Sequence, residues 1–517
     1  MLVILKNALT RINKIVVEVG NLDEQKKFNL IYLIVCDSLR DYQNNLNKIR
    51  EIKFKNFFET LSFEQNIVTL TDDNTNKIVG YIFKYSEDKN VNNDINNSID
   101  YEIPPEQNPQ PSQPPIPNNP QSLTQIFKNP PMLGLQNVGA TCYMNATIQC
   151  FGQIEKFSLY FKFDPHIKEV IKKYRGNDCL TESFKDLIEN LWPTDKEYLK
   201  AKYRGKNSNN EYYIPKKFKE KISKMNPLFQ GAQANDAKDL VNFLVMQLHE
   251  ELNIGMKSNN NGEVPQTNEN LIFNNFCQTY YYENKSIICD LFYGINGTKY
   301  ECSNCHTQKY NFQIGFFYIF PLEEVKKYKI LRLQQQFDLY LKMQLANNMI
   351  DYNNMLYMQQ CANIQNQNIN SVSIMDCFDY NQKIEYMVGD NAMYCNTCNR
   401  SENATYQNYI ANCPEVIIII LNRGQGIQFK VKCEFTEFLD IKNYVKYHNN
   451  TSCQYKLIGV VTHMGESGSS GHFVAFCKSP IDNQWYNYND DLCFLVNNFK
   501  EQVIDYAMPY ILFYQKI

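Results

Sequence analysis

The sequence contains no long apolar segment and no excess of charge of one sign. Its longest strongly apolar run, Val416–Leu421, is far too short to cross a lipid bilayer. The 52 lysines and arginines nearly balance the 55 aspartates and glutamates, and the lysines are spread along the chain. Met1–Val19 mixes charged with apolar residues and has no clean small-residue cleavage site. We therefore expect no membrane span, no nucleic-acid-binding surface and no secretory leader.

Histidine is scarce, and its distribution restricts where acid–base chemistry can occur. The chain has six histidines, none of them within residues 1–100, and Cys36 is the only cysteine of that region. A helical pattern over residues 24–50 and alternating apolar stretches at Ile67–Leu70 and Ile78–Phe83 predict a small α+β region or a partner-docking module. No motif indicates its role, and we expect no second active site there.

A proline-rich segment at residues 101–122 divides the chain. Its prolines cannot form a packed core and favour an extended polyproline-II spacer. A ligand for a proline-binding module is the alternative to a plain linker. Residues 123–517 carry every motif with chemistry, and we expect them to form the catalytic domain.

Seventeen cysteines are scattered along the chain. Without a secretory leader we interpret them as reduced thiols of an intracellular protein, cytoplasmic or nuclear, with some of them binding metal. Two Cys-x-x-Cys pairs, about ninety residues apart, supply the candidate ligands Cys302, Cys305, Cys395 and Cys398. Four thiolates satisfy a tetrahedral zinc ion and leave no open catalytic position, so we predict one structural zinc per chain. A single pair could be a redox motif, but neither lies in a thioredoxin-like context.

The stretch Gly134–Phe151 has the features of a reactive thiol site. Gly134 and Gly139 allow backbone angles that other residues avoid. Thr141 is a candidate helix N-cap, and Cys142 follows at the first helical position, before apolar residues at helical spacing. The positive end of a helix stabilises a thiolate over a thiol. A buried cysteine at the start of a core helix is the simpler alternative.

A second stretch far downstream argues against that alternative. Gly471-His472-Phe473 is followed by Trp485–Asp491, more than 300 residues after Cys142. The first stretch resembles the cysteine box of the ubiquitin-specific proteases, and the second resembles their histidine box. The two boxes occur in the family's order, and the resemblance extends from about Asn129 to the C-terminus.

The resemblance implies a catalytic triad of Cys142, His472 and Asn489. Cys142 would attack the carbonyl carbon at the C-terminus of ubiquitin, and His472 would activate the thiol and protonate the leaving amine. Asn489 would orient the imidazole, and the neighbouring Asp490 is the alternative or an assistant. The side chain of Asn137 and the backbone N–H of Cys142 would bind the oxyanion.

Further substrate contacts are implied by the same resemblance. Asp236 and Asp239 open a helical pattern that resembles the family's glutamine-box helix, where acidic residues contact arginines near the ubiquitin C-terminus. Gly471 would leave room for the Gly-Gly tail. His463 is a rival general base, which we interpret as structural because His472 directly follows the glycine.

The implied fold is α+β, a papain-like cysteine protease core with a helical thumb, a β palm and zinc-tipped fingers, preceded by a small N-terminal region. A helical, glutamine-rich insertion is expected at residues 323–379. The implied activity is that of a deubiquitinating thiol isopeptidase acting on ubiquitin and ubiquitinated proteins, with zinc as the only cofactor. A silent ubiquitin-binding scaffold and a protease for a ubiquitin-like modifier are the rival functions. The sequence leaves the oligomeric state open.

Overall fold

The computed structural model describes residues 62–64, 67–71, 78–83, 122–130, 132–174, 179–193, 204–206, 211–257, 268–347, 349–367, 369–424, 430–447, 452–465, 471–505 and 508–517. The chain divides into one unit of Met1–Gln113 with Gln336–Cys361 and a second unit of Pro114–Gln335 with Ala362–Ile517. In the first unit, the strands β1 (Ser62–Glu64), β2 (Ile67–Thr71) and β3 (Ile78–Phe83) form an antiparallel sheet. The two alternating apolar stretches are therefore strands. The helical pattern at residues 24–50 and nearly all of the proline-rich segment lie outside the described residues.

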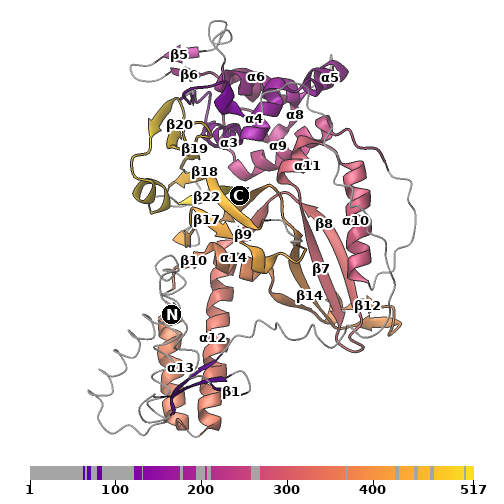
Figure 1. The fold of residues 1–517 in the computed structure, drawn as a ribbon, viewed down its shortest axis with the longest axis vertical. Coiled ribbons are helices and arrows are strands. Elements are labelled where there is room, and N and C mark those ends of the chain that lie inside the picture. The colour runs from indigo at the N-terminus through magenta and orange to yellow at the C-terminus, as the bar shows by residue number, and fades with distance from the viewer. Residues whose placement is uncertain are drawn as a thin grey trace. The chain divides into compact units, whose positions relative to one another are not determined.

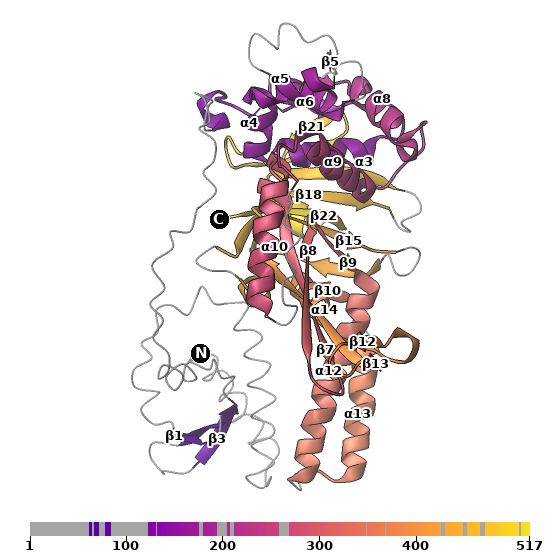
Figure 2. The same ribbon diagram turned by 90° about the vertical axis from the view of Figure 1, so that its right-hand side faces the viewer.

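The part of the second unit from Cys142 to Phe292 is largely helical. Its described helices are α3 (Cys142–Gly152), α4 (Glu155–Phe163), α5 (His166–Lys173), α6 (Leu180–Leu191), α8 (Lys216–Met225), α9 (Ala237–Leu252), α10 (Glu269–Glu283) and α11 (Ile287–Phe292). Figures 1 and 2 show α3, α4, α6, α8 and α9 grouped on one side of a large sheet. Every residue of α3 is buried, because α3 packs between α9 and the sheet. The helix that begins with Cys142 is thus the centre of the core.

The large sheet has eight strands. Along the order β21-β20-β19-β18-β22-β15-β9 the neighbours are hydrogen-bonded, and β17 pairs separately with β18. Their bounds are β9 (Tyr318–Pro321), β15 (Val416–Asn422), β17 (Phe438–Asp440), β18 (Gln454–Met464), β19 (His472–Lys478), β20 (Trp485–Asn489), β21 (Leu492–Leu495) and β22 (Pro509–Lys516). The apolar run of β15 sends Ile418 into the core under the helices and Ile419 into a second core. A strand buried on both faces requires such a continuous run.

A second sheet extends from the first as a ribbon. Its order is β11-β14-β7-β8, with β7 (Gly294–Cys302), β8 (Gln308–Gly315), β11 (Ile384–Met387) and β14 (Ala404–Asn412). A hairpin of β12 (Met393–Cys395) and β13 (Arg400–Glu402) lies at its far end, and α10 lies beside β7 and β8 in both views (Figures 1 and 2). The ribbon has only a small core of its own around Phe273, Ile295, Phe312 and Ala411.

The glutamine-rich stretch between the Cys-x-x-Cys pairs is largely helical. It contains α12 (Leu322–Ala346), α13 (Tyr352–Gln367) and α14 (Ile374–Asn381), and β10 (Ser371–Ser373) pairs in parallel with β16 (Lys432–Glu434). A three-stranded sheet of β4 (Gly134–Leu135), β6 (Glu211–Tyr213) and β5 (Arg204–Lys206) lies next to the start of the cysteine box. Among the described residues, none of the helices combines the length and apolarity that crossing a membrane requires.

Candidate active site and metal centre

Cys142 is the first residue of α3 and is 6% exposed. Thr141 occupies the N-cap position, but its hydroxyl does not cap α3. Instead, Thr141 Oγ1 accepts a hydrogen bond from the N–H of Val138 at 3.0 Å, which closes the loop in front of the helix. The loop therefore places the thiol at the N-terminus of a buried helix, where the free backbone N–H groups carry partial positive charge.

His472 is the first residue of β19 and lies against the thiol. Its imidazole interacts with the Cys142 side chain, and its Nε2 lies 2.6 Å from Oδ1 of Asn489. The contact with Cys142 raises the pKa of His472 to about 9, helped by Asn489 and opposed by burial. The imidazole is therefore protonated at neutral pH, which suits a thiolate–imidazolium pair. Asn489 reaches the ring because β20 pairs directly with β19.

Asp490 lies closer to two asparagines of the cysteine box than to His472. Its carboxylate accepts hydrogen bonds from Asn145 Nδ2 at 2.8 Å and from Asn137 Nδ2 at 3.0 Å, whereas His472 Nε2 is 4.0 Å away. Asp490 directly follows the end of β20 and has a positive φ of 50°. The two neighbouring residues thus contact different partners.

Asn137 is fixed from both ends of its amide. Its Oδ1 accepts from the N–H of Thr141 at 3.0 Å and of Gly139 at 3.2 Å, so its nitrogen faces Asp490. The backbone joins the same two segments, because the N–H of Leu135 donates to the carbonyl oxygen of Asp490 at 2.7 Å. A Cβ on Gly134 would lie 2.4 Å from the backbone of Asp491, so only glycine allows this approach. Residues 353 positions apart are thereby held together.

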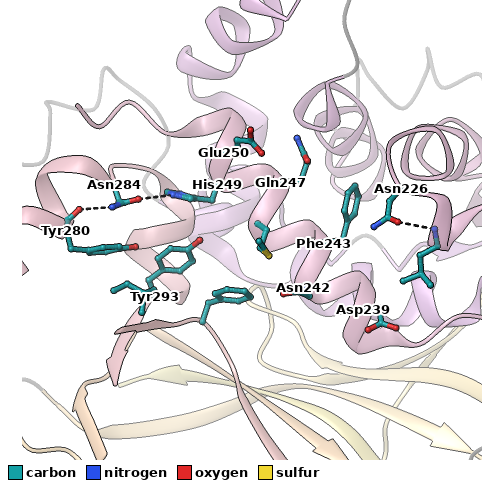
Figure 3. A pocket seen from close by; sticks show the side chains of 14 residues that line it. Asn226, Asp239, Asn242, Phe243, Gln247, His249, Glu250, Tyr280, Asn284 and Tyr293 are labelled. Carbon is teal, nitrogen blue, oxygen red and sulfur yellow. Dashed lines mark hydrogen bonds between the residues drawn. The ribbon is translucent and has the colours of Figure 1, made fainter. Parts of the chain in front are cut away.

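The two acidic residues of the glutamine-box stretch have different surroundings. Asp236 is the N-cap of α9, and its Oδ1 accepts the N–H of Lys238 at 2.9 Å. Asp239 lies in the first turn, where burial and the charge of Asp236 raise its pKa although Lys238 lowers it. Asp239 lines a cavity of about 670 Å³ with Phe243, Met246 and other residues (Figure 3).

Gly471 and His463 lie beside His472. A Cβ on Gly471 would lie 2.4 Å from Cε1 of His463 and 2.6 Å from the carbonyl oxygen of Met464, so a side chain here would force a shift. His463 is buried, its ring packs 4.7 Å from that of Phe473, and burial lowers its pKa. This environment suits a structural histidine. Residues 466–470 lie outside the described residues.

Two contributors to the site had no signal in the sequence motifs. Asn145 is buried within α3 and donates to the carbonyl oxygen of Leu135 as well as to Asp490. Tyr510 on β22 donates its hydroxyl hydrogen bond to Asp236. No local pattern in the sequence marks either Asn145 or Tyr510 as part of the site.

The two Cys-x-x-Cys pairs meet at the end of the ribbon. The sulfurs of Cys302, Cys305, Cys395 and Cys398 all lie within 4.8 Å of one another. Cys305 Sγ is 3.5 Å from Cys395 Sγ, and Cys302 Sγ is 3.9 Å from Cys398 Sγ. Tetrahedral zinc with Zn–S bonds of about 2.3 Å separates its sulfurs by roughly 3.8 Å. The four thiols can therefore hold a structural metal ion.

Comparison with known proteins gives a consistent result. The family model described as ubiquitin carboxyl-terminal hydrolase matches residues 133–514. The chain is 26% identical over 392 residues to ubiquitin carboxyl-terminal hydrolase 3 of Homo sapiens, covering 74% of this chain and 67% of that protein. It is 22% identical over 392 residues to ubiquitin carboxyl-terminal hydrolase 2 of Bos taurus, covering 74% of this chain and 55% of that protein.

Among solved structures, the chain is similar to one described as the SAGA Ubp8/Sgf11/Sus1/Sgf73 DUB module bound to ubiquitin aldehyde. The identity is 18%, the TM-score is 0.45, and the match covers 75% of this chain and 70% of that chain. The family match spans most of the described residues and confirms the expected α+β fold class and the class of cysteine-type deubiquitinases. The chain belongs to the ubiquitin carboxyl-terminal hydrolase family.

Proposed function

We propose that the protein hydrolyses the isopeptide bond between the C-terminal glycine of ubiquitin and a lysine of a substrate or of another ubiquitin. The observation that carries this proposal is the contact chain from Cys142 through His472 to Asn489, assembled from two distant segments. Such a nucleophile–base–orienter arrangement is what acyl transfer requires.

The proposed reaction begins with attack of the Cys142 thiolate on the carbonyl carbon of the terminal glycine. The oxyanion that forms receives hydrogen bonds from the backbone N–H of Cys142 and from the amide of Asn137. The imidazolium of His472 then protonates the leaving lysine amine, and a thioester remains. Water, deprotonated by neutral His472, hydrolyses the thioester and releases ubiquitin with a free carboxylate.

We assign separate roles to Asn489 and Asp490. Asn489 orients the imidazole, which is supported by its 2.6 Å contact with Nε2. Asp490 orients Asn137 and ties the cysteine box to the histidine box, which is supported by its two contacts with asparagine amides. Asn489 thus supports proton transfer by His472, and Asp490 supports stabilisation of the oxyanion by Asn137.

We propose that the metal of the four-cysteine cluster is zinc and that its role is structural. The donor set consists of thiolates only, with no open position for substrate or water. Zinc would supply a cross-link there. Cys302 and Cys305 lie at the β7–β8 turn, and Cys395 and Cys398 lie at the β12–β13 turn, so these residues would hold the two turns together.

We further propose that Asp236 and Asp239 bind basic residues of the ubiquitin tail. The acidic pair at the start of α9 supports this proposal.

We also propose that the protein acts inside the cell, in the cytoplasm or nucleus. The cysteines of the described residues are all free thiols, which supports a reducing compartment.

A panel of suicide probes tests the activity. Ubiquitin and ubiquitin-like modifiers that carry a thiol-reactive C-terminus should be compared on the parent protein and on Cys142→Ala. We expect covalent labelling of the parent by the ubiquitin probe and none of the variant. Labelling by a ubiquitin-like probe alone would identify another modifier as substrate. Ubiquitin binding without any labelling would indicate a silent scaffold.

A further inference from the structure

Tyr510 contacts the start of α9 from the opposite half of the catalytic unit. Its hydroxyl lies 2.7 Å from Oδ1 and 2.6 Å from Oδ2 of Asp236, so it hydrogen-bonds both oxygens of one carboxylate. The tyrosine belongs to β22 of the large sheet, and the aspartate is the N-cap of α9. The hydroxyl therefore joins the sheet to the helical side at an acid that we assign to substrate binding.

The ring of Tyr510 extends this connection toward the catalytic histidine. It packs 5.5 Å from the ring of Phe473, which directly follows His472 on β19. Tyr510 is only 8% exposed, so both the ring and the hydroxyl have fixed surroundings. A rotation of the tyrosine would therefore disturb both the carboxylate of Asp236 and the ring of Phe473 on β19.

Besides Tyr510, the carboxylate of Asp236 contacts two groups of Lys238, and only one of these contacts can be replaced by a substrate. Its Oδ1 accepts the backbone N–H of Lys238, and its Oδ2 lies 3.0 Å from the ammonium of the same lysine. The side chains of Lys238 and Asp236 are 34% and 29% exposed, and an ion pair of this kind contributes little free energy. Replacing the Lys238 ammonium at Oδ2 by another cation therefore costs little free energy.

We propose that Tyr510 is a positioning residue for substrate, which holds the carboxylate of Asp236 so that its Oδ2, the oxygen paired with Lys238, receives a basic side chain of the ubiquitin tail. In the free protein Lys238 occupies that oxygen, and a substrate guanidinium displaces it. This inference rests on the proposed function, because it assigns Asp236 to substrate binding. It adds a residue of β22 to a contact otherwise confined to α9.

Substitution of the hydroxyl tests the role. Tyr510→Phe keeps the ring against Phe473 and removes only the donor to Asp236. Without that donor the carboxylate is no longer held for the substrate, and the loss of one hydrogen bond to a charged group from the complex corresponds to about a tenfold change in affinity. We expect KM for a fluorogenic ubiquitin substrate to rise about tenfold with kcat within about twofold, since the contact serves binding and not the chemical step. In the inactive Cys142→Ala background, Kd for ubiquitin should rise by the same factor.

A double-mutant cycle and a matched control separate positioning from stability. If Tyr510 acts through Asp236, Tyr510→Phe should change KM less than about twofold in an Asp236→Asn background, where the helix cap is preserved. Tyr514 lies on the same strand as Tyr510, and Tyr514→Phe removes a hydrogen bond from its hydroxyl to the carbonyl oxygen of Thr436. This control variant should leave KM unchanged.

Each contrary outcome has a defined meaning. An unchanged KM for Tyr510→Phe, a fall in kcat alone, or equal effects in both Asp236 backgrounds would overturn the inference. If the parent binds ubiquitin without hydrolysing it, the proposed function fails, and the Kd comparison alone decides the role of Tyr510. If the parent neither binds nor hydrolyses ubiquitin, both proposals fall.

Discussion

The catalytic site and the four-cysteine cluster are assembled in the same way but supported differently. Each brings together two short segments that are far apart in sequence. The catalytic segments rest on a large core and are joined by Asp490 to Asn137 and Asn145. The cysteines lie at the end of a ribbon with a small core, and Cys305 and Cys398 are partly exposed.

This difference indicates what each site needs in order to form. The catalytic contacts are all made between protein groups, so the chain alone can organise them. The cluster places four thiols together with little buried apolar surface to hold them, and a bound metal supplies free energy of folding where packing does not. We therefore expect changes at one site to leave the other intact, and the following variants test that independence.

The largest effect is expected at the nucleophile. Cys142→Ala removes the attacking sulfur, so hydrolysis of a fluorogenic ubiquitin substrate should fall by at least about 10⁴-fold. Metal content and ubiquitin binding should stay near the parent values, as measured by elemental analysis and calorimetry. Turnover within tenfold of the parent would show that another group performs the chemistry.

The next effect distinguishes Asn489, the last residue of β20, from Asp490, which follows it. Asn489→Ala should lower kcat by ~10²–10⁴-fold, because the imidazole loses its orienter. Asn489→Asp should be tolerated, since an acceptor oxygen remains and the imidazolium gains a counter-charge. Asp490→Ala should lower kcat less than Asn489→Ala does, because Asp490 contacts Asn137 and acts on the reaction only through it. Steady-state rates that rank the two alanine variants in the reverse order would make Asp490 the orienter.

Loss of the metal should affect the four-cysteine cluster and leave the catalytic contacts intact. Cys302→Ser, or prolonged chelation, should abolish stoichiometric zinc and lower the melting temperature, because the two turns lose their cross-link. We expect KM for ubiquitin to rise several-fold to about tenfold while kcat changes little. Cys361→Ser, which alters a partly exposed cysteine outside the cluster, is the matched control. A parent protein without stoichiometric metal by elemental analysis would refute the site.

The smallest effect is a shift in pH dependence. His472 has its pKa raised to about 9, so its proton is present at neutral pH and is lost as the pH rises through that value. The rate constant kcat/KM should therefore fall along an alkaline limb near pH 9, where the acid for the leaving amine disappears. Asn489→Ala should move this limb to lower pH, because the hydrogen bond from Asn489 contributes to the raised pKa. An unmoved limb would assign the titration to another group.

Much of the site was predictable because its signals are local. Cys142 at a helix start and the cysteine pairs follow from residue identity over a few positions, and the apolar run of β15 follows from its unbroken pattern. The pairing of Cys142 with His472 was predictable only through the family resemblance, since no periodicity relates segments so far apart.

The remaining contacts depend on geometry that the sequence pattern does not carry. Asn489 and Asp490 are adjacent in the sequence, and no pattern indicates that the first contacts His472 while the second contacts Asn137 and Asn145. The link from Tyr510 to Asp236 depends on which strand lies next to which, and sheet order is a long-range property. The spacing within α3 indicated one apolar face, but the helix is buried all round because Asn145 and Gln149 donate to backbone carbonyl oxygens.

The position of β22 has a consequence for biosynthesis. This strand follows every other strand of the large sheet in the chain, yet it lies between β18 and β15. Translation proceeds from the N-terminus, so a nascent polypeptide has two open strand edges until β22 emerges from the ribosome. Such edges pair readily with other chains, which makes the incomplete domain a client for chaperones. A product of premature termination before β22 also lacks Tyr510 and the middle of its sheet, so it is a candidate for degradation rather than a partly active protease.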